Sequence, residues 1–157
     1  MIPAIVPGST TPAEWFIVFR QASPIWLAEK MAFGRYKHVS CFGPVPAVAG
    51  WLFFDFGVHG AFVNVVPDYA ANAAIGAAVA GAVTVVRWTS PPDYESPEWH
   101  LKPVFVCTTA VAHLTGVPSC ALRPDRFLRD CLAAGAETVI AGDEDVRWRQ
   151  VEARPGA

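Results

Sequence analysis

The sequence has little charge. Only 17% of its 157 residues are Asp, Glu, Lys or Arg, and the formal net charge is −2. A nucleic-acid-binding domain ordinarily carries a basic patch or stripe, whereas the few basic residues here are scattered, apart from Arg123, Arg126 and Arg129. The composition therefore predicts no nucleic-acid partner.

The sequence also lacks a segment suited to the membrane. The apolar stretch Met1 to Ser9 is too short for the hydrophobic part of a signal peptide, and no basic residues precede it. A spanning helix needs about 20 predominantly apolar residues, but Asn72 and glycines interrupt the longest apolar stretch, Ala70 to Val86. We expect a protein with no membrane span that is cytoplasmic as synthesised, with a virion or phage-like particle as a second location.

Metal-binding and disulfide patterns are missing as well. The four cysteines, Cys41, Cys107, Cys120 and Cys131, are irregularly spaced and form no CxxC pair. His38 and Cys41 are three residues apart, which in a strand places them on opposite faces, and no second pair with zinc-ligand spacing follows. Phosphate-binding glycine loops and GxSxG or HExxH motifs are also absent. The sequence predicts free thiols, no metal and no cofactor.

What the sequence does contain is enough apolar residues, 53%, for the core of a single domain. Apolar runs predict strands at residues 15–19, 36–42, 51–56, 61–66, 83–88 and 139–140, and helices at 25–33, 70–82, 108–115 and 124–135. The segment 90–103, with four prolines, is the longest expected loop. We expect one α+β domain over residues 1–157. It comprises an N-terminal extension with one helix (1–35), a catalytic-like core (36–140) and a frayed tail (141–157).

Cys107 is the residue best suited to carry chemistry. It follows the apolar run Val104 to Val106 and lies where a helix is expected to begin. Free N–H groups and partial positive charge at a helix N-terminus favour a thiolate, and they can form part of an oxyanion hole. The small Thr108 and Thr109 leave the sulfur open to approach. The alternative is a buried structural cysteine, which is the commoner role.

A nucleophilic cysteine needs a base, and the sequence has four histidines. His38 is the best candidate because a strand is a rigid place to hold an imidazole. His113 follows Cys107 by six positions on the same helix and is expected to face away from it. His59 falls in a predicted turn, and His100 in the proline-rich loop.

The base must in turn be oriented by a third group. Asp55 is a carboxylate within the apolar run 51–56, where it needs a partner or solvent. If the strands at 36–42 and 51–56 are antiparallel neighbours, His38 and Asp55 lie across from each other. Asn64, on the next strand, is the reserve candidate. The alternatives are a histidine packed at a sheet face and an aspartate that faces outward.

The order of these residues resembles that of the circularly permuted NlpC/P60-like cysteine hydrolases of the papain-like superfamily. In these proteins a strand histidine comes first, a polar residue lies on the following strand, and the cysteine begins a late helix. The matching segments are Lys37-His38-Val39 with Trp51 to Asp55, the cysteine helix Phe105 to Val117, and Arg123 to Ala136, which is similar to the next helix in small phage and phage-like members. Arg123 departs from the usual Ser or Thr cap, and residues 1–30 match nothing.

The resemblance implies a papain-like antiparallel sheet packed against a few helices. It implies a hydrolase of the cysteine peptidase or amidase type, with Cys107 as nucleophile, His38 as base and Asp55 as the orienting residue. The implied substrate is a peptide or amide, and a phage-like origin favours peptidoglycan peptides. The alternative is a non-catalytic virion or tail protein of the same fold, whose partners are particle or tail proteins.

Overall fold

The fold is described from a computed structural model, over residues 12–22, 34–57, 60–92, 94 and 106–141. The strands are β1 (Glu14–Arg20), β2 (His38–Val45), β3 (Gly50–Gly57), β4 (Gly60–Pro67), β5 (Ala82–Thr89) and β6 (Glu137–Ala141). The α-helices are α2 (Ala71–Val79), α3 (Cys107–Thr115) and α4 (Pro124–Ala133), and two short 3-10 helices are η1 (Pro46–Val48) and η2 (Asp68–Ala70). The helix expected at 25–33, most of the loop expected at 90–103 and the tail beyond 141 lie outside the described residues.

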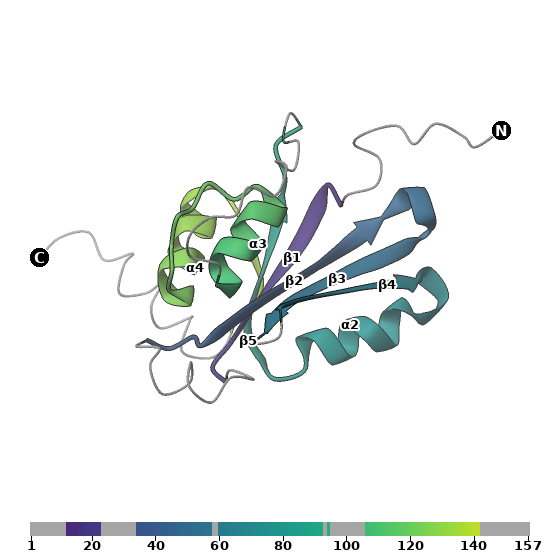
Figure 1. Cartoon of the computed structure of the whole chain (residues 1–157), viewed down its shortest axis with the longest axis horizontal. Coiled ribbons are helices and arrows are strands. Elements are labelled where there is room, and N and C mark those ends of the chain that lie inside the picture. The colour runs from purple at the N-terminus through teal and green to yellow at the C-terminus, as the bar shows by residue number, and fades with distance from the viewer. Residues whose placement is uncertain (1–11, 23–33, 58–59, 93, 95–105, 142–157) are drawn as a thin grey trace, which may run out of the picture.

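The six strands form one antiparallel sheet in the order β4-β3-β2-β1-β5-β6, with the helices packed on it (Figure 1). All six strands predicted from the sequence are present, with ends shifted by a few residues. The prediction of an α+β domain with an antiparallel sheet is therefore confirmed.

Strand β1 lies in the middle of the sheet. Its Ile17 is the Cα partner of Cys41 on β2 and of Val86 on β5. The strand is buried on both faces, as central strands are. The segment 1–35, expected as an extension of the core, thus contains one of the core's central strands, and the expected boundary at residue 36 does not follow the fold.

The two faces of the sheet are covered differently. Helices α3 and α4 lie together over one face (Figure 1). The larger core cluster there includes Trp15, Ile17, Phe19, Cys41, Phe54, Val86, Val111, Phe127 and Cys131. Helix α2 covers part of the other face, where Val18, Phe42 and Val85 form a smaller cluster with Phe53, Ile75 and Val79. Residues that alternate along β1 and β2 therefore enter different cores.

The longest apolar stretch of the sequence, residues 70–86, is divided between two elements. Its first part forms the nine-residue helix α2 and its last part enters β5. Gly81, with a φ of 70°, makes the turn between them. In the described part of the chain, no helix is long and apolar enough to cross a membrane.

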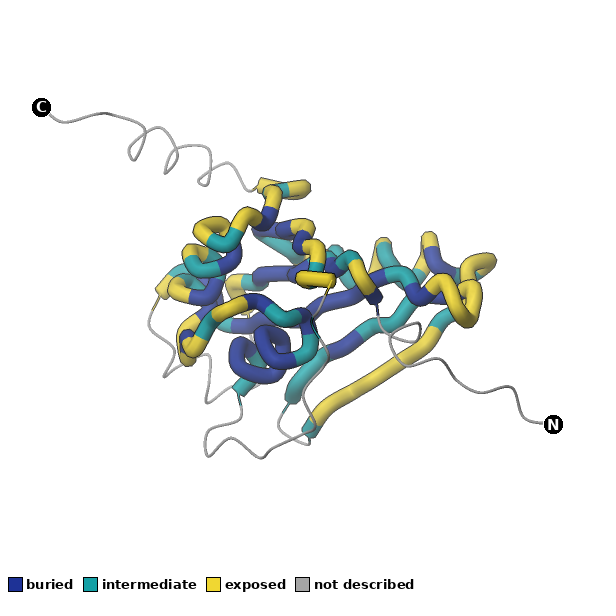
Figure 2. The backbone as a smooth tube through the Cα atoms, turned by 90° about the horizontal axis from the view of Figure 1, so that it is seen from above, coloured by how far each residue is buried: buried dark blue, intermediate teal, exposed yellow. Residues whose placement is uncertain are grey.

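Strand β4 is an edge of the sheet and the most exposed of the longer strands (Figure 2). Phe62, Val63 and Val65 are 59%, 60% and 55% exposed, and the strand carries no charged residue. Natural edge strands usually carry charges, prolines or bulges that prevent pairing with other chains. Apart from the terminal Pro67, β4 lacks such protection.

A glycine in β2 is required by close packing of the chain entering β1. A Cβ on Gly43 would lie 2.3 Å from the carbonyl oxygen of Glu14 and 2.8 Å from Cβ of Pro12. We predict that Gly43→Ala lowers the free energy of unfolding by about 1–3 kcal/mol, because the backbone must move to admit the methyl group. Urea unfolding followed by tryptophan fluorescence measures this change.

The matched control is Gly76→Ala in α2, where an added Cβ meets nothing within 4 Å. Alanine is the better helix former, so this variant should gain about 0.5–1 kcal/mol. Equal losses in the two variants would contradict the packing explanation.

Candidate active site

The candidate site lies where β2 and β3 diverge. Their antiparallel register ends at Cys41 and Phe54. Beyond this point β2 stays paired with β1 as far as His38, and β3 stays paired with β4 as far as Gly57. The two strands thus continue side by side without pairing to each other, and the side chains of His38 and Asp55 meet across the gap.

His38 and Asp55 form a short hydrogen bond. His38 Nε2 lies 2.6 Å from Asp55 Oδ1, and the histidine is 3% exposed whereas the aspartate is 46% exposed. The backbone N–H of Phe56 donates to the same Oδ1 at 2.7 Å, which fixes the carboxylate. Because Nε2 is engaged, Nδ1 is the ring nitrogen left for a second partner.

That second partner is Cys107. It is the first residue of α3, it is half-buried, and its thiol lies within hydrogen-bonding reach of the His38 side chain. Helix α3 packs against β2 and β3, which brings the thiol to the gap between them. The structure therefore brings together the three residues that the sequence singled out.

The gap explains how one imidazole meets groups from both faces of the sheet. Strict alternation places His38 and Ser40 of β2 on the face that α2 covers, whereas Cys107 belongs to a helix on the opposite face. A paired β3 strand would stand between them. Since the pairing has already ended at Cys41, the ring of His38 is reached from both sides.

The start of α3 is held by its own side chains. Val106, in extended conformation, precedes the helix, and its N–H donates to the hydroxyl of Thr109 at 3.0 Å. The N–H groups of Cys107 and Thr108 belong to the first turn, where an α-helix offers no acceptor. Such donors are suited to stabilise a negative oxygen beside the sulfur.

The charges around His38 favour its protonated form. Burial tends to lower the pKa of His38, but the hydrogen bonds and charges of Asp55 and Cys107 outweigh burial and raise it to about 9. Burial tends to raise the pKa of Asp55, but the hydrogen bond and charge of His38, the Phe56 N–H and the Arg20 charge together hold it below its usual range. An imidazolium–carboxylate pair is therefore the stable state at neutral pH.

The other cysteines are less suited to react as nucleophiles beside an imidazole. Cys41 is buried, and burial together with the Asp55 charge raises its thiol pKa well above the ordinary value. Burial raises the pKa of Cys131 to about 12. Cys120 is exposed, on the segment before α4. Among the residues that the structure describes, Cys107 is the one cysteine that combines partial exposure with a neighbouring histidine.

The remaining polar candidates lie apart from this group. Asn64 is exposed on β4, one strand further from the histidine than Asp55. His113 is buried in the second half of α3. His59 and His100 lie outside the described residues. Asp55, not the reserve candidate Asn64, is the residue bonded to His38.

Sequence reasoning misses one residue beside the site, Arg20, and the capping role of another, Thr109. Arg20, at the end of β1, is the Cα partner of His38, and its Nη1 donates to the hydroxyl of Ser40 at 2.7 Å. Thr109 caps α3. The one signal for Arg20 is a charge that ends an apolar strand, and nothing links it to His38 until the pairing of β1 with β2 is known.

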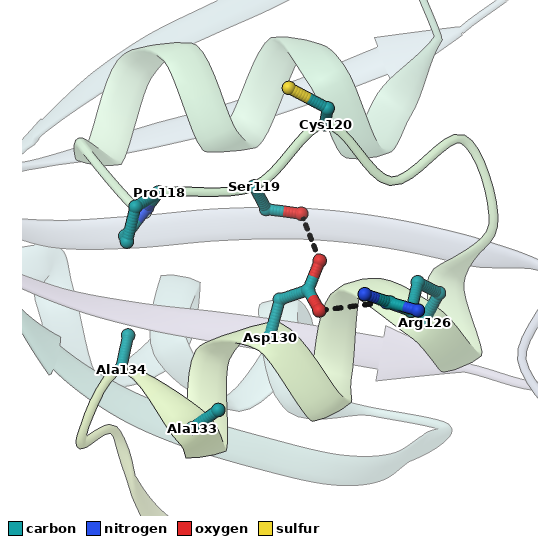
Figure 3. Close-up of a pocket in the computed structure, with 7 residues that line it drawn as sticks. All are labelled: Pro118, Ser119, Cys120, Arg126, Asp130, Ala133 and Ala134. Carbon is teal, nitrogen blue, oxygen red and sulfur yellow. Dashed lines mark hydrogen bonds and ion pairs between the residues drawn. The ribbon is translucent and has the colours of Figure 1, made fainter.

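A separate hollow of about 410 Å³ lies between α4 and the segment before it (Figure 3). It is lined by Pro118, Ser119, Cys120, Arg126, Asp130, Ala133 and Ala134. Asp130 accepts hydrogen bonds from the Ser119 hydroxyl at 2.7 Å and from Arg126 Nε at 2.9 Å. With no histidine among these lining residues, the hydroxyl has no imidazole base, and the carboxylate serves to fasten the segment to α4.

Comparison of the chain with protein-family models, with curated proteins and with solved structures finds no match. Among the described residues, no group of three His, Cys, Asp or Glu side chains is placed to hold a metal ion. What the chain does must therefore be inferred from the arrangement of Cys107, His38 and Asp55.

The His38–Asp55 pair predicts that stability depends on pH. The pKa of His38 is raised from an ordinary 6.5 to about 9 in the folded protein. The resulting stabilisation is complete below pH 6.5 and is lost as the pH rises through 9. We predict that the free energy of unfolding falls by up to about 1.4 kcal/mol per pH unit across this window. Urea unfolding at intervals from pH 6 to about 10 measures the slope.

Asp55→Asn should flatten this profile, because the amide cannot hold the imidazolium by charge. Asp130→Asn is the matched control: its carboxylate is bound to Ser119 and Arg126, so the slope should stay that of the parent protein. Identical slopes in the parent and in Asp55→Asn would refute the assignment of the titration to this pair.

Proposed function

We propose that the protein is a cysteine hydrolase in which Cys107 is the nucleophile, His38 the base and Asp55 the orienting residue. The observation that carries the proposal is the position of His38. Its Nε2 is 2.6 Å from Asp55 Oδ1, and its ring is within hydrogen-bonding reach of the Cys107 thiol. The nucleophile, the base and the group that orients the base therefore form a continuous chain of contacts.

The proposed reaction is acyl transfer. In the reacting state the proton shared by Cys107 and His38 lies on the imidazole, and the sulfur of Cys107 attacks the carbonyl carbon of an amide or ester. Negative charge develops on the carbonyl oxygen beside the N–H groups of the first turn of α3. His38 then gives the proton to the leaving amine or alcohol, and a thioester remains. Water, deprotonated by His38, attacks the thioester, which releases the acid and restores the thiol.

The proposed substrate class follows from the resemblance to the permuted NlpC/P60-like hydrolases. It is a peptide or amide, and a phage-like origin favours cell-wall peptides. The papain-like character of the fold belongs to the same proposal, and two features support it: an antiparallel sheet, and a helix that begins at the cysteine and packs on the histidine strand. The proposed locations are the cytoplasm, where the chain is made, and a virion or phage-like particle.

A second candidate function is a structural or adaptor role in such a particle. It is favoured by the uncharged edge strand β4, whose Phe62, Val63 and Val65 are more than half exposed, and by Tyr69, which is 91% exposed. An edge strand of this kind can pair with a strand of another chain. On this interpretation Cys107, His38 and Asp55 are present but catalyse no reaction.

Alkylation tests whether the contact with His38 makes the Cys107 thiol reactive. We predict that iodoacetamide at neutral pH labels Cys107 at least roughly tenfold faster than the exposed Cys120, because a cysteine beside a histidine reacts faster than an isolated one. His38→Ala should remove this advantage and leave Cys120 unchanged as an internal control. Peptide mapping by mass spectrometry gives both rates from one sample.

Hydrolysis tests the proposal directly on fluorogenic peptide amides and on peptidoglycan fragments. Cys107→Ala should abolish turnover, and His38→Ala should lower kcat/KM on the order of 10²–10⁴-fold, the usual worth of general base catalysis. Cys120→Ala, matched in chemistry and outside the proposed triad, should retain full activity. Undiminished turnover in Cys107→Ala would refute the proposal. An inactive parent protein that is alkylated first at Cys120 would favour the structural role.

A further inference from the structure

Arg20 connects the candidate site to a helix on the far face of the sheet. It is the last residue of β1 and lies opposite His38 in the pairing of β1 with β2. Its Nη1 donates to the Ser40 hydroxyl at 2.7 Å, and its Nη2 donates to the carbonyl oxygen of Ala78 in the last turn of α2. A partly buried cation thus lies between α2 and the end of β2 that carries the histidine.

The bond to Ala78 alone has a structural explanation. The last carbonyls of a helix lack intrahelical partners, and a cation there satisfies one of them. The second donor contact is not explained in this way, because it directs the same guanidinium toward Ser40. Ser40 and His38 alternate onto one face of β2, so this contact places the positive charge beside the strand end that His38 occupies.

The charge of Arg20 also acts on Asp55. Burial tends to lower the pKa of Arg20, and the negative charge of Asp55 opposes that effect. In the other direction, Arg20 is among the groups that hold the pKa of Asp55 below its usual range. The geometry agrees with this: Cys41 pairs with Phe54, so the register places Ser40, which Arg20 contacts, at the level of Asp55 and on the same face of the sheet.

We propose that Arg20 is a positioning residue of the site, which holds the Asp55 carboxylate toward His38 by charge and couples its placement to the docking of α2 through Ser40 and Ala78. Its role in a reaction rests on the proposed function. The electrostatic coupling between Arg20 and Asp55 does not rest on that function, and it can be measured even if the protein catalyses no reaction.

The test uses the full chain with three substitutions. Arg20→Gln removes the charge and keeps a hydrogen-bonding amide, whereas Arg20→Lys keeps the charge. Arg87→Gln is the matched control, because Arg87 is an arginine of β5 whose ion pair with Glu137 is exposed. The readout is the pH titration of the Asp55 carboxyl carbon by NMR.

We expect the Asp55 titration midpoint to move to higher pH in Arg20→Gln, to return toward that of the parent in Arg20→Lys, and to stay unchanged in Arg87→Gln. A residue that merely supports the fold would lower the unfolding midpoint without moving this titration.

An unchanged Asp55 midpoint in folded Arg20→Gln overturns the inference. If Arg20→Gln does not fold, Ser40→Ala removes one of the two anchors with little change in volume, and the same titration decides: a shift to higher pH supports the inference and no shift overturns it. Absence of hydrolysis in the parent protein refutes the proposed function and leaves this titration unaffected, so the two failures are distinguishable.

Discussion

The hydrogen bond between His38 and Asp55 joins β2 and β3 just beyond the point where their backbone pairing ends. Pairing of β2 with β3 ends at Cys41 and Phe54, and the next connection between the two strands is the 2.6 Å contact between these side chains. The contact engages Nε2, leaves Nδ1 as the ring nitrogen available to Cys107 and helps to raise the pKa of the imidazole. The orientation of the imidazole and the charge that it carries both depend on this bond.

Much of the fold follows from patterns local to each segment. Runs of β-branched and aromatic residues predict all six strands, and Pro124 and Gly135 bound the last helix as expected. The order of the strands in the sheet is not local, because it depends on which edges pair. For this reason the strand at Glu14–Arg20 could be predicted, while its place at the centre of the sheet could not.

The candidate site was likewise predictable only in part from local sequence. An acidic residue within an apolar strand and a cysteine at a helix start are visible in the sequence, so Asp55 and Cys107 could be proposed from their immediate neighbours. Their approach to His38 depends on where the pairing of β2 with β3 ends, which is set by the twist and register of the whole sheet. Arg20 could not be identified from the sequence. It belongs to β1, and only the pairing of β1 with β2 brings it beside His38.

The divergence of β2 and β3 has a mechanical consequence for the β3–β4 hairpin. The hairpin is joined to the rest of the sheet over five residue pairs, from Val45 and Gly50 to Cys41 and Phe54, and it extends past the last of them. The part of the hairpin beyond these pairs carries Asp55 and is not joined to β2 by backbone hydrogen bonds. The hydrogen bond from His38 to Asp55 holds it to β2 instead. The proton on His38 therefore bears both on the thiol of Cys107 and on the side-chain link that joins the unpaired ends of β2 and β3.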